Sequence, residues 1–227
     1  VCTNGIGYVD LMFKTDSIAP EPIPYLGLLK SVLGYVDTEH YTYGELFNEI
    51  NANTGGINCG VEVFDRADST EEFQAMFSVR GKALYTKMDF LFKMIGEILN
   101  SSKLEDTKRL YEIVASVKSR AQVNLTGAGH STAVLRAAAY SSPMAAFQDE
   151  MAGIGYYQFI EKLEKDFEQR KEETVEELCK LMKKILRPEN FMISYTGERE
   201  SLETVQKLAG AVKAGLGTEP VEKSEEK

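Results

Sequence analysis

The spacing of apolar residues changes near Lys82, and this change divides the chain into a first part with strand patterns and a longer helical part. Before Lys82 the period is two, because Val9, Leu11 and Phe13 fall on one face of an expected strand. After Lys82 the period is 3.6, which predicts an amphipathic helix ending near Asn100. Its apolar stripe consists of Leu84, Met88, Leu91, Phe92, Ile95, Ile98 and Leu99.

The first 80 residues predict three strands and two helices. The strands are expected at 8–13, 58–65 and 73–80, and the helices at 24–33 and 43–53. Thr42 is a good N-cap for the second helix, and Glu45 three residues later completes a capping box. Gly55 and Gly56 are expected to end that helix. A polar hairpin loop is predicted at 65–70.

Beyond residue 100 the pattern predicts a run of helices followed by one strand and a last helix. The helices are expected around 110–127, 131–140, 143–153, 156–167 and 175–185, the strand at 191–195, and the last helix at 202–216. The short helix at 131–140 is rich in small residues and is expected to pack closely. We therefore predict an α+β fold, a two-layer α/β sandwich whose mostly antiparallel or mixed sheet has helices on one face. Residues 1–218 are expected to form one domain and 219–227 a charged linker or tail.

Composition and charge exclude several functional classes for this chain. The net charge of −9 over 227 residues disfavours nucleic-acid binding, which usually requires a basic patch. No apolar run approaches the ~20 residues that span a bilayer, so no membrane partner is expected. Cys2, Cys59 and Cys179 lie far apart without metal-ligand spacing, which predicts free thiols in a reducing compartment. The two ends favour a domain cut from a longer protein, with a processed mature protein as the alternative.

Few residues are candidates for catalysis or metal binding. A catalytic zinc site needs three converging protein ligands, and the chain contains only two histidines, His40 and His130. Neither is predicted to bind metal, since His40 stands in an expected loop with no second ligand one helical turn away. For His130 we favour a structural role in which it or Ser131 caps a helix, with a general base beside Ser131 as the alternative. Cys59 lacks a neighbouring base and is expected to be an inert thiol.

Four segments carry a resemblance to a known family through their order and spacing. They are Pro24–Leu33, Tyr41–Ile57, Arg80–Ala83 and Gly129–Ala133. Within a similarity that runs from Gly5 to about Gly197, they resemble the pitrilysin/insulinase family of zinc peptidases, in particular its presequence-protease branch (peptidase M16, subfamily C). Catalytic domains of that family carry His-x-x-Glu-His on the first of these helices, whereas Pro24–Leu33 contains neither histidine nor carboxylate. The chain therefore looks like the non-catalytic third domain, which begins the C-terminal half.

The resemblance implies that the full-length parent is a zinc metalloendopeptidase that degrades peptides in a closed chamber. It implies no catalytic residue, metal ligand or cofactor in this segment, which alone is expected to be inactive. The segment would act as chamber wall and as structural partner of the N-terminal, zinc-bearing half. Alternatives are a structural or interaction subunit of a degenerate peptidase-family assembly without proteolytic activity, and a free-standing small-molecule enzyme. The expected location is the bacterial cytoplasm, or an organelle matrix in a eukaryote.

One segment remains as a candidate for contact with substrate. In catalytic members of the family, the strand after the second helix is an edge strand to which extended peptide adds. The corresponding residues here are Ile57, Asn58, Cys59, Gly60, Val61, Glu62 and Val63. The alternative is that this strand is simply paired within its own sheet. The net charge of −9 further suggests a chamber wall that favours basic, presequence-like peptides.

Overall fold

The computed structural model describes residues 2–16, 18, 21–65 and 72–218 of the chain. Four strands form one sheet in the order β2-β3-β1-β4, and each neighbouring pair is antiparallel. The strands are β1 (Ile6–Lys14), β2 (Ile57–Asp65), β3 (Phe73–Leu84) and β4 (Phe191–Thr196). The predicted α+β class is confirmed, and the sheet is antiparallel throughout its described part.

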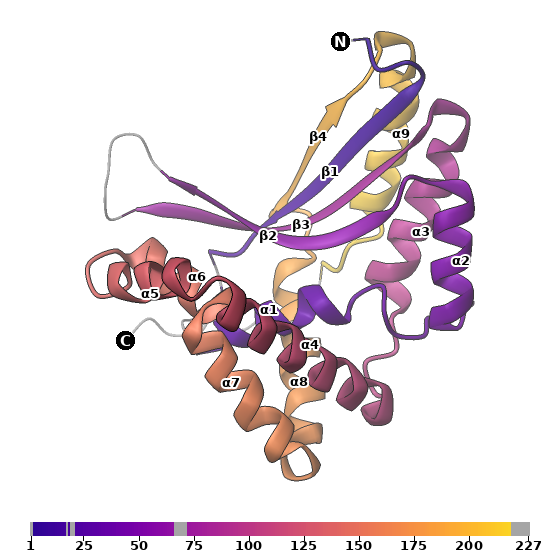
Figure 1. Ribbon diagram of the computed structural model, residues 1–227. Coiled ribbons are helices and arrows are strands. Elements are labelled where there is room, and N and C mark those ends of the chain that lie inside the picture. Colours follow the sequence, from indigo (N-terminus) through magenta and orange to yellow (C-terminus); the bar gives the residue numbers. More distant parts are fainter. Residues whose placement is uncertain (1, 17, 19–20, 66–71, 219–227) are drawn as a thin grey trace.

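The helices lie in two groups, as Figure 1 shows. One group covers a face of the sheet, where α3 contacts β3, α9 contacts β4, and α2 packs against α3. The other group surrounds α1 at one end of the sheet. The helices are α1 (Ile23–Val32), α2 (Tyr43–Asn53), α3 (Met88–Ser101), α4 (Thr107–Gly127), α5 (Gly129–Ala138), α6 (Pro143–Ala152), α7 (Ile154–Lys165), α8 (Phe167–Ile185) and α9 (Leu202–Ala214), with 3-10 turns at Tyr85–Lys87 and Arg199–Ser201.

The alternation expected for the first strand is present. Val9, Leu11 and Phe13 are at most 2% exposed and face the helices, whereas Tyr8 on the opposite face is 44% exposed. The capping box of α2 is also confirmed, because the Thr42 side chain accepts from the Glu45 amide and the Glu45 carboxylate accepts from the Thr42 amide.

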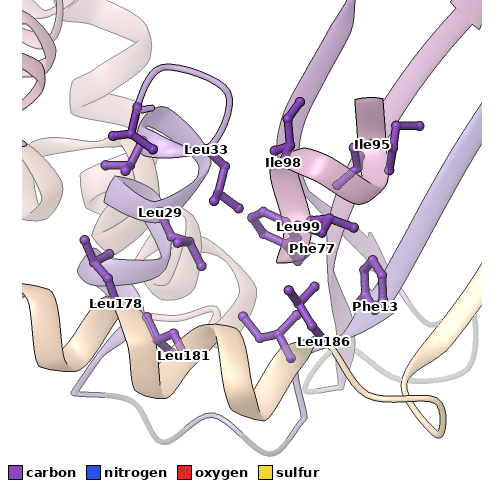
Figure 2. Packing of buried hydrophobic residues seen from close by; sticks show 14 of the residues in the cluster. Phe13, Leu29, Leu33, Phe77, Ile95, Ile98, Leu99, Leu178, Leu181 and Leu186 are labelled. Atoms are coloured by element: carbon purple, nitrogen blue, oxygen red, sulfur yellow. The ribbon is translucent and has the colours of Figure 1, made fainter. Parts of the chain in front are cut away.

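A single apolar core joins the two helix groups. Figure 2 shows Phe13 and Phe77 of the sheet beside Ile98 and Leu99 of α3, and across from them Leu29 of α1. Leucines of α8 and the residue that follows it, Leu178, Leu181 and Leu186, complete the contact. Because these side chains are almost fully buried, the sheet and the helical group share one hydrophobic core rather than two.

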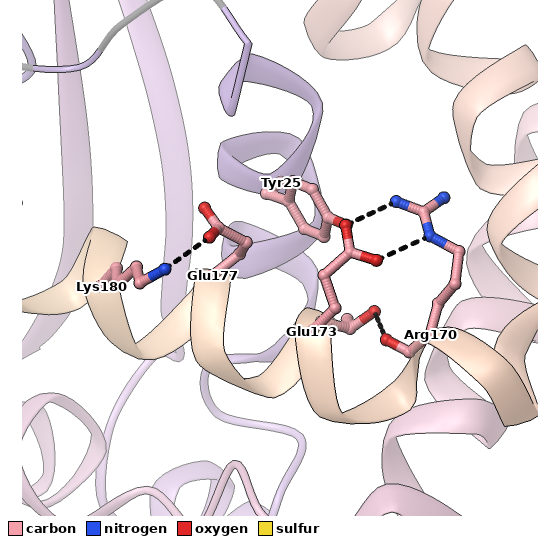
Figure 3. Close-up of polar contacts among 6 residues, drawn as sticks. Tyr25, Arg170, Glu173, Glu177 and Lys180 are labelled. Atoms are coloured by element: carbon pink, nitrogen blue, oxygen red, sulfur yellow. Dashed lines mark hydrogen bonds and ion pairs between the residues drawn. The ribbon is translucent and has the colours of Figure 1, made fainter.

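Helix α1 is the centre of the second group and is buried on nearly every side, as a helix that is apolar all round should be. Gly27 permits a close approach to α7, because a Cβ there would lie 2.7 Å from Cε2 of Tyr156. Polar contacts also join α1 to α8 (Figure 3): Arg170 donates to the Tyr25 hydroxyl at 2.9 Å and pairs with Glu173 at 3.0 Å. Burial is the main cause that raises the pKa of Tyr25.

Three predictions about local structure are wrong. Leu84 belongs to β3, not to the following helix, and is 55% exposed. Strand β3 runs four residues beyond the predicted end at Arg80, because β1 pairs with it as far as Leu84. The third error concerns α5, whose residues are all described: it contacts α4 and α6, but none of its residues is buried, so the close packing expected for it is not present.

The predicted cap at His130 or Ser131 is also wrong. Helix α5 begins at Gly129 with Ala128 in the N-cap position and no side-chain capping bond. His130 is therefore in the first turn of the helix. The predicted loop at 65–70 lies, apart from Asp65, outside the described residues, as does the predicted tail at 219–227.

Candidate functional site

Strand β2 is an edge strand. It pairs with β3 along its whole length, from Ile57 opposite Gly81 to Asp65 opposite Phe73, and within the described part of the chain no strand pairs with its other side. In an antiparallel strand, alternate residues direct their backbone N–H and C=O groups away from the partner strand. The outer side of β2 therefore presents backbone groups of the kind to which an extended peptide can add.

All seven predicted substrate residues lie on β2, and the pleat divides them between the two faces of the sheet. Ile57, Cys59 and Val61 pack against the hydrophobic core, and Val63 follows them on the same face. The other three, Asn58, Gly60 and Glu62, belong to the face opposite the helices. The structure thus brings the predicted residues together along one edge.

The face opposite the helices carries polar residues in register across all four strands. Ser194, Asp10, Arg80 and Asn58 form one cross-sheet row, and the neighbouring row contains Thr196, Tyr8 and Lys82. A shallow hollow of about 480 Å³ lies over these rows; its lining includes Tyr8, Asp10, Asn58, Arg80, Lys82 and Ser194. Composition and periodicity did not predict this hollow, because it depends on the strand order.

Arg80 lies between the two acidic residues of this face and pairs with both. Its Nε donates to Asp10 Oδ2 at 2.8 Å, and a second guanidinium nitrogen lies 3.1 Å from Glu62 Oε1. The hydrogen bond with Asp10 is the main cause that raises the pKa of Arg80. Asp10 Oδ1 is buried without a hydrogen-bond partner among the described residues, and Lys82 forms no ion pair with any of them. With respect to the described residues, the hollow therefore offers one acceptor without a partner, Asp10 Oδ1, and one cation outside any ion pair, Lys82.

The glycine pair after α2 shapes the rim of the hollow. Gly56 has a φ of +105°, which residues with a Cβ rarely adopt. A Cβ on Gly55 would lie 2.6 Å from the Lys82 side chain, and the Gly55 amide donates to the Lys82 carbonyl at 2.7 Å. Glycine is thus favoured at position 56 by its backbone conformation, and a side chain at position 55 would displace that of Lys82.

The residues considered for catalysis come from different elements: Cys59 lies on β2, His40 in the loop before α2, and His130 with Ser131 on α5. Burial raises the pKa of the Cys59 thiol to about 12, which is consistent with the inert thiol predicted. His40 is bound by Glu97 of α3, with Nδ1 3.0 Å from Oε2, a partner that sequence spacing did not reveal. Burial works to raise the pKa of Glu97, but hydrogen bonds from Thr38 and His40 hold it below its usual value. Within the described residues, no three His, Cys, Asp or Glu side chains are grouped so that they could hold a metal ion.

By its fold, the chain belongs to the class of α+β domains that have an antiparallel sheet with an open edge and helices on one face. Its family follows from the sequence, because residues 1–163 match the family described as associated with peptidase M16, subfamily C. The chain belongs to this family. The predicted resemblance to the presequence-protease branch is therefore confirmed.

Individual relatives agree with the family. The chain is 34% identical over 201 residues to Protein HypA of Clostridium perfringens, which covers 88% of this chain and 20% of that protein. It is 29% identical over 168 residues to the mitochondrial presequence protease of Yarrowia lipolytica, covering 74% and 17% respectively. It is 26% identical over 205 residues to presequence protease 1, chloroplastic/mitochondrial, of Arabidopsis thaliana, covering 90% and 19%. The chain thus spans about a fifth of the length of the curated relatives it matches.

A solved structure shares the fold. A conserved protein from Enterococcus faecalis V583 superimposes with a TM-score of 0.61 over 91% of this chain and 47% of that one, at 13% sequence identity. Among the described helices of the present chain, none combines the length and apolarity needed to cross a membrane.

Proposed function

We propose that this chain is a non-catalytic domain of a zinc metalloendopeptidase that degrades peptides in a closed chamber. In that enzyme it forms part of the chamber wall and is the structural partner of the zinc-bearing half. The observation that carries the proposal is the family match over residues 1–163, together with relatives named presequence protease of which the chain spans only a fifth. The zinc and its ligands belong to the rest of the polypeptide, because the described residues offer no set of three ligands.

The chemical contribution of this chain is then binding and enclosure. A peptide held in extended form can add to the free edge of β2 through backbone hydrogen bonds, which are independent of peptide sequence. Asn58 and Glu62 stand beside that edge on the polar face, where they can contact side chains of the peptide. Such backbone binding suits an enzyme that must accept many unfolded peptides.

The complete reading frame that contains this chain provides the first test. The full polypeptide and residues 1–227 alone are purified, assayed for hydrolysis of an unstructured peptide, and analysed for bound zinc. We expect zinc and chelator-sensitive cleavage in the full polypeptide only. A full polypeptide without zinc and without cleavage would favour a structural subunit, and cleavage by residues 1–227 alone would overturn the proposal.

The role of the β2 edge is tested separately by photo-crosslinking in the full polypeptide. A photoreactive side chain is placed at position 58 or 62, a peptide is bound, and the complex is then irradiated. Position 192 is the matched control, since Met192 lies on the same face of the sheet but on the opposite edge strand, β4, and is 45% exposed. We expect peptide adducts from positions 58 and 62 and none from 192; adducts from none of the three would exclude the edge as a substrate site.

The proposed preference for basic peptides rests on the net charge of −9. On the polar face, however, Arg80 neutralises part of the charge of Asp10 and Glu62, so we expect a modest preference. The measurement is kcat/KM of the full polypeptide for two peptides that differ only in replacing lysine by glutamate. Equal values at low ionic strength would remove the charge preference and leave the chamber-wall role intact.

A further inference from the structure

One long surface segment of the chain is almost without charge. Residues 121–148 run from the end of α4 through α5 into α6, and Arg136 is their only lysine, arginine, aspartate or glutamate. At the chain average of 27% charged residues, a segment of this length would carry about eight. We call residues 121–148 the uncharged segment.

The uncharged segment is exposed. The structure describes every one of its residues, and Ala145 alone among them is buried. Large apolar side chains point into solvent: Val123 is 70% exposed, Val134 69% and Tyr140 85%. His130, Ala133 and Ala137 share an exposed face of α5, because their spacing of three to four residues places them on one side of the helix. In Figure 1, α5 and α6 lie at the outer end of the helical group.

The only charge of the segment is directed back into the domain. Arg136 of α5 pairs with Asp149 of α6 at 2.6 Å, and the Asp149 side chain is 1% exposed. The same carboxylate accepts the backbone amides of Ile154 at 3.0 Å and Gly155 at 3.1 Å, where α7 begins. This ion pair attaches α5 to the domain from its inner side, so its outer face is left without charge.

A surface with so few charges is unusual where a domain faces water, but it is common at the centre of a protein–protein interface. Surfaces of soluble domains carry interspersed charges, whereas the centre of a protein–protein interface is depleted of them. Membrane-surface helices are instead rich in lysine and arginine on their polar face, which this segment lacks. Most of the polypeptide in the relatives lies outside the region matched by this chain, which spans 17–20% of their length.

We propose that the outer face of α5, with the end of α4 and Tyr140, docks against an uncharged apolar surface of another domain in the same polypeptide. This rests on the part of the proposed function that makes the chain one domain of a larger protein, but it requires no peptidase activity. An occupant in the same polypeptide is favoured because tethering gives it an effective concentration of the order of millimolar. The contact would cover the exposed apolar side chains that nothing in this domain covers, within its described residues.

The test measures how fast a cysteine reacts with a maleimide at the proposed contact. Val134→Cys, and Tyr140→Cys in a second variant, are compared in residues 1–227 and in the full polypeptide, with modified sites identified by mass spectrometry. Glu168→Cys is the matched control, since the Glu168 side chain on α8 is 80% exposed. We expect labelling at 134 and 140 to be slower by at least about tenfold in the full polypeptide, and labelling at 168 to be unchanged.

Each outcome of the labelling experiment either supports or overturns the proposed docking surface. Equal labelling of positions 134 and 140 in both proteins overturns the proposal. Protection in residues 1–227 that grows with protein concentration assigns the face to a second copy instead, and protection that appears only with added peptide assigns it to substrate. Because labelling does not depend on turnover, protection in a full polypeptide that lacks peptidase activity would retain the docking surface while removing the enzymatic function.

Discussion

The uncharged segment and α8 lie in the same helical group, yet they meet solvent in opposite ways. Helix α8 carries ten charged residues among its nineteen, and the opposite side of the helix buries Phe167, Thr174, Leu178, Leu181 and Ile185. The uncharged segment carries one charge in 28 residues and buries Ala145 alone, all of its residues being described. Helix α8 has a buried apolar side and a charged exposed side, as a surface helix of a globular domain should. The segment packs only Phe147 partly against the core and has almost no charge on its exposed surface.

The difference teaches that exposure and polarity are independent properties of a surface. In α8 the sequence pattern alone predicts which side is buried, because the apolar and charged positions alternate with the helical period. In the uncharged segment the pattern indicates burial that the described residues of this chain do not supply. Substitutions at Leu178 and Asp149 test this comparison directly, and substitutions in α1 and α3 then test contacts elsewhere in the fold, in order of decreasing expected effect.

Leu178→Ala in α8 should be the most destabilising change. Leu178 is fully buried, and removing a buried leucine side chain leaves a cavity that typically costs about 3 kcal/mol. Val134→Ala in α5 is the matched control and should change the free energy of unfolding by less than about 0.5 kcal/mol. Urea denaturation of residues 1–227 measures the free energy of unfolding of both variants. Equal losses of stability would contradict the difference expected between α8 and the uncharged segment.

Asp149→Ala should cost about 2 kcal/mol. Its carboxylate accepts two backbone amides at the start of α7, and each buried donor left without a partner costs roughly 1–3 kcal/mol, reduced where water enters. Hydrogen exchange should also rise throughout α5, because the pair with Arg136 is lost. If exchange in α5 stays unchanged while α7 is destabilised, the ion pair does not hold α5 in place.

Gly27→Ala should cost about 1–2 kcal/mol, since its Cβ would lie 2.7 Å from the Tyr156 ring and 2.9 Å from the Met151 carbonyl oxygen. Gly96→Ala in α3 is the control, because a Cβ at that position meets no described atom within 4 Å. We expect it to stabilise the protein by up to about 1 kcal/mol through helix propensity. Opposite signs for the two variants, measured by thermal unfolding, would confirm that α1 and α7 are in close contact.

Glu97→Gln should have the smallest effect, below about 1 kcal/mol at neutral pH, because its partner His40 is largely exposed. Hydrogen bonds lower the pKa of Glu97 from its usual 4.5 despite burial, so the stabilisation is complete above that pH. It is lost as the pH falls through the lower pKa of the folded state. Unfolding measured between pH 7 and pH 3 should therefore show the two proteins converging in acid; a constant difference would rule out this linkage.

Much of the fold could be predicted from the sequence because its signals are local. The capping box at Thr42 and Glu45 fixed one helix start, and the alternation of Val9, Leu11 and Phe13 fixed the face of β1. The error at Leu84 arose because an apolar residue at a strand end also fits the period of the helix that follows. Local periodicity contains no information about how far a partner strand extends, and this pairing is what lengthens β3.

The candidate site was predictable only in part. The sequence placed residues 57–63 on one strand, but the position of that strand at the sheet edge depends on the order of all four strands. The pairs of Arg80 with Asp10 and of His40 with Glu97 join residues far apart in the chain, so no spacing rule reveals them. The wrong expectation for α5 has a physical cause too: its composition suits a contact, but the partner surface is not within the described part of this chain.

The place of β1 between β3 and β4 has a consequence for synthesis on the ribosome. Residues 8–13 pair with residues 191–196, so the last sheet partner of β1 emerges some 180 residues after β1 itself. At 5–20 residues per second this interval is roughly 10 to 40 s. Throughout it the nascent chain carries an unpaired, apolar strand edge, and strand exchange between neighbouring nascent copies competes with correct closure.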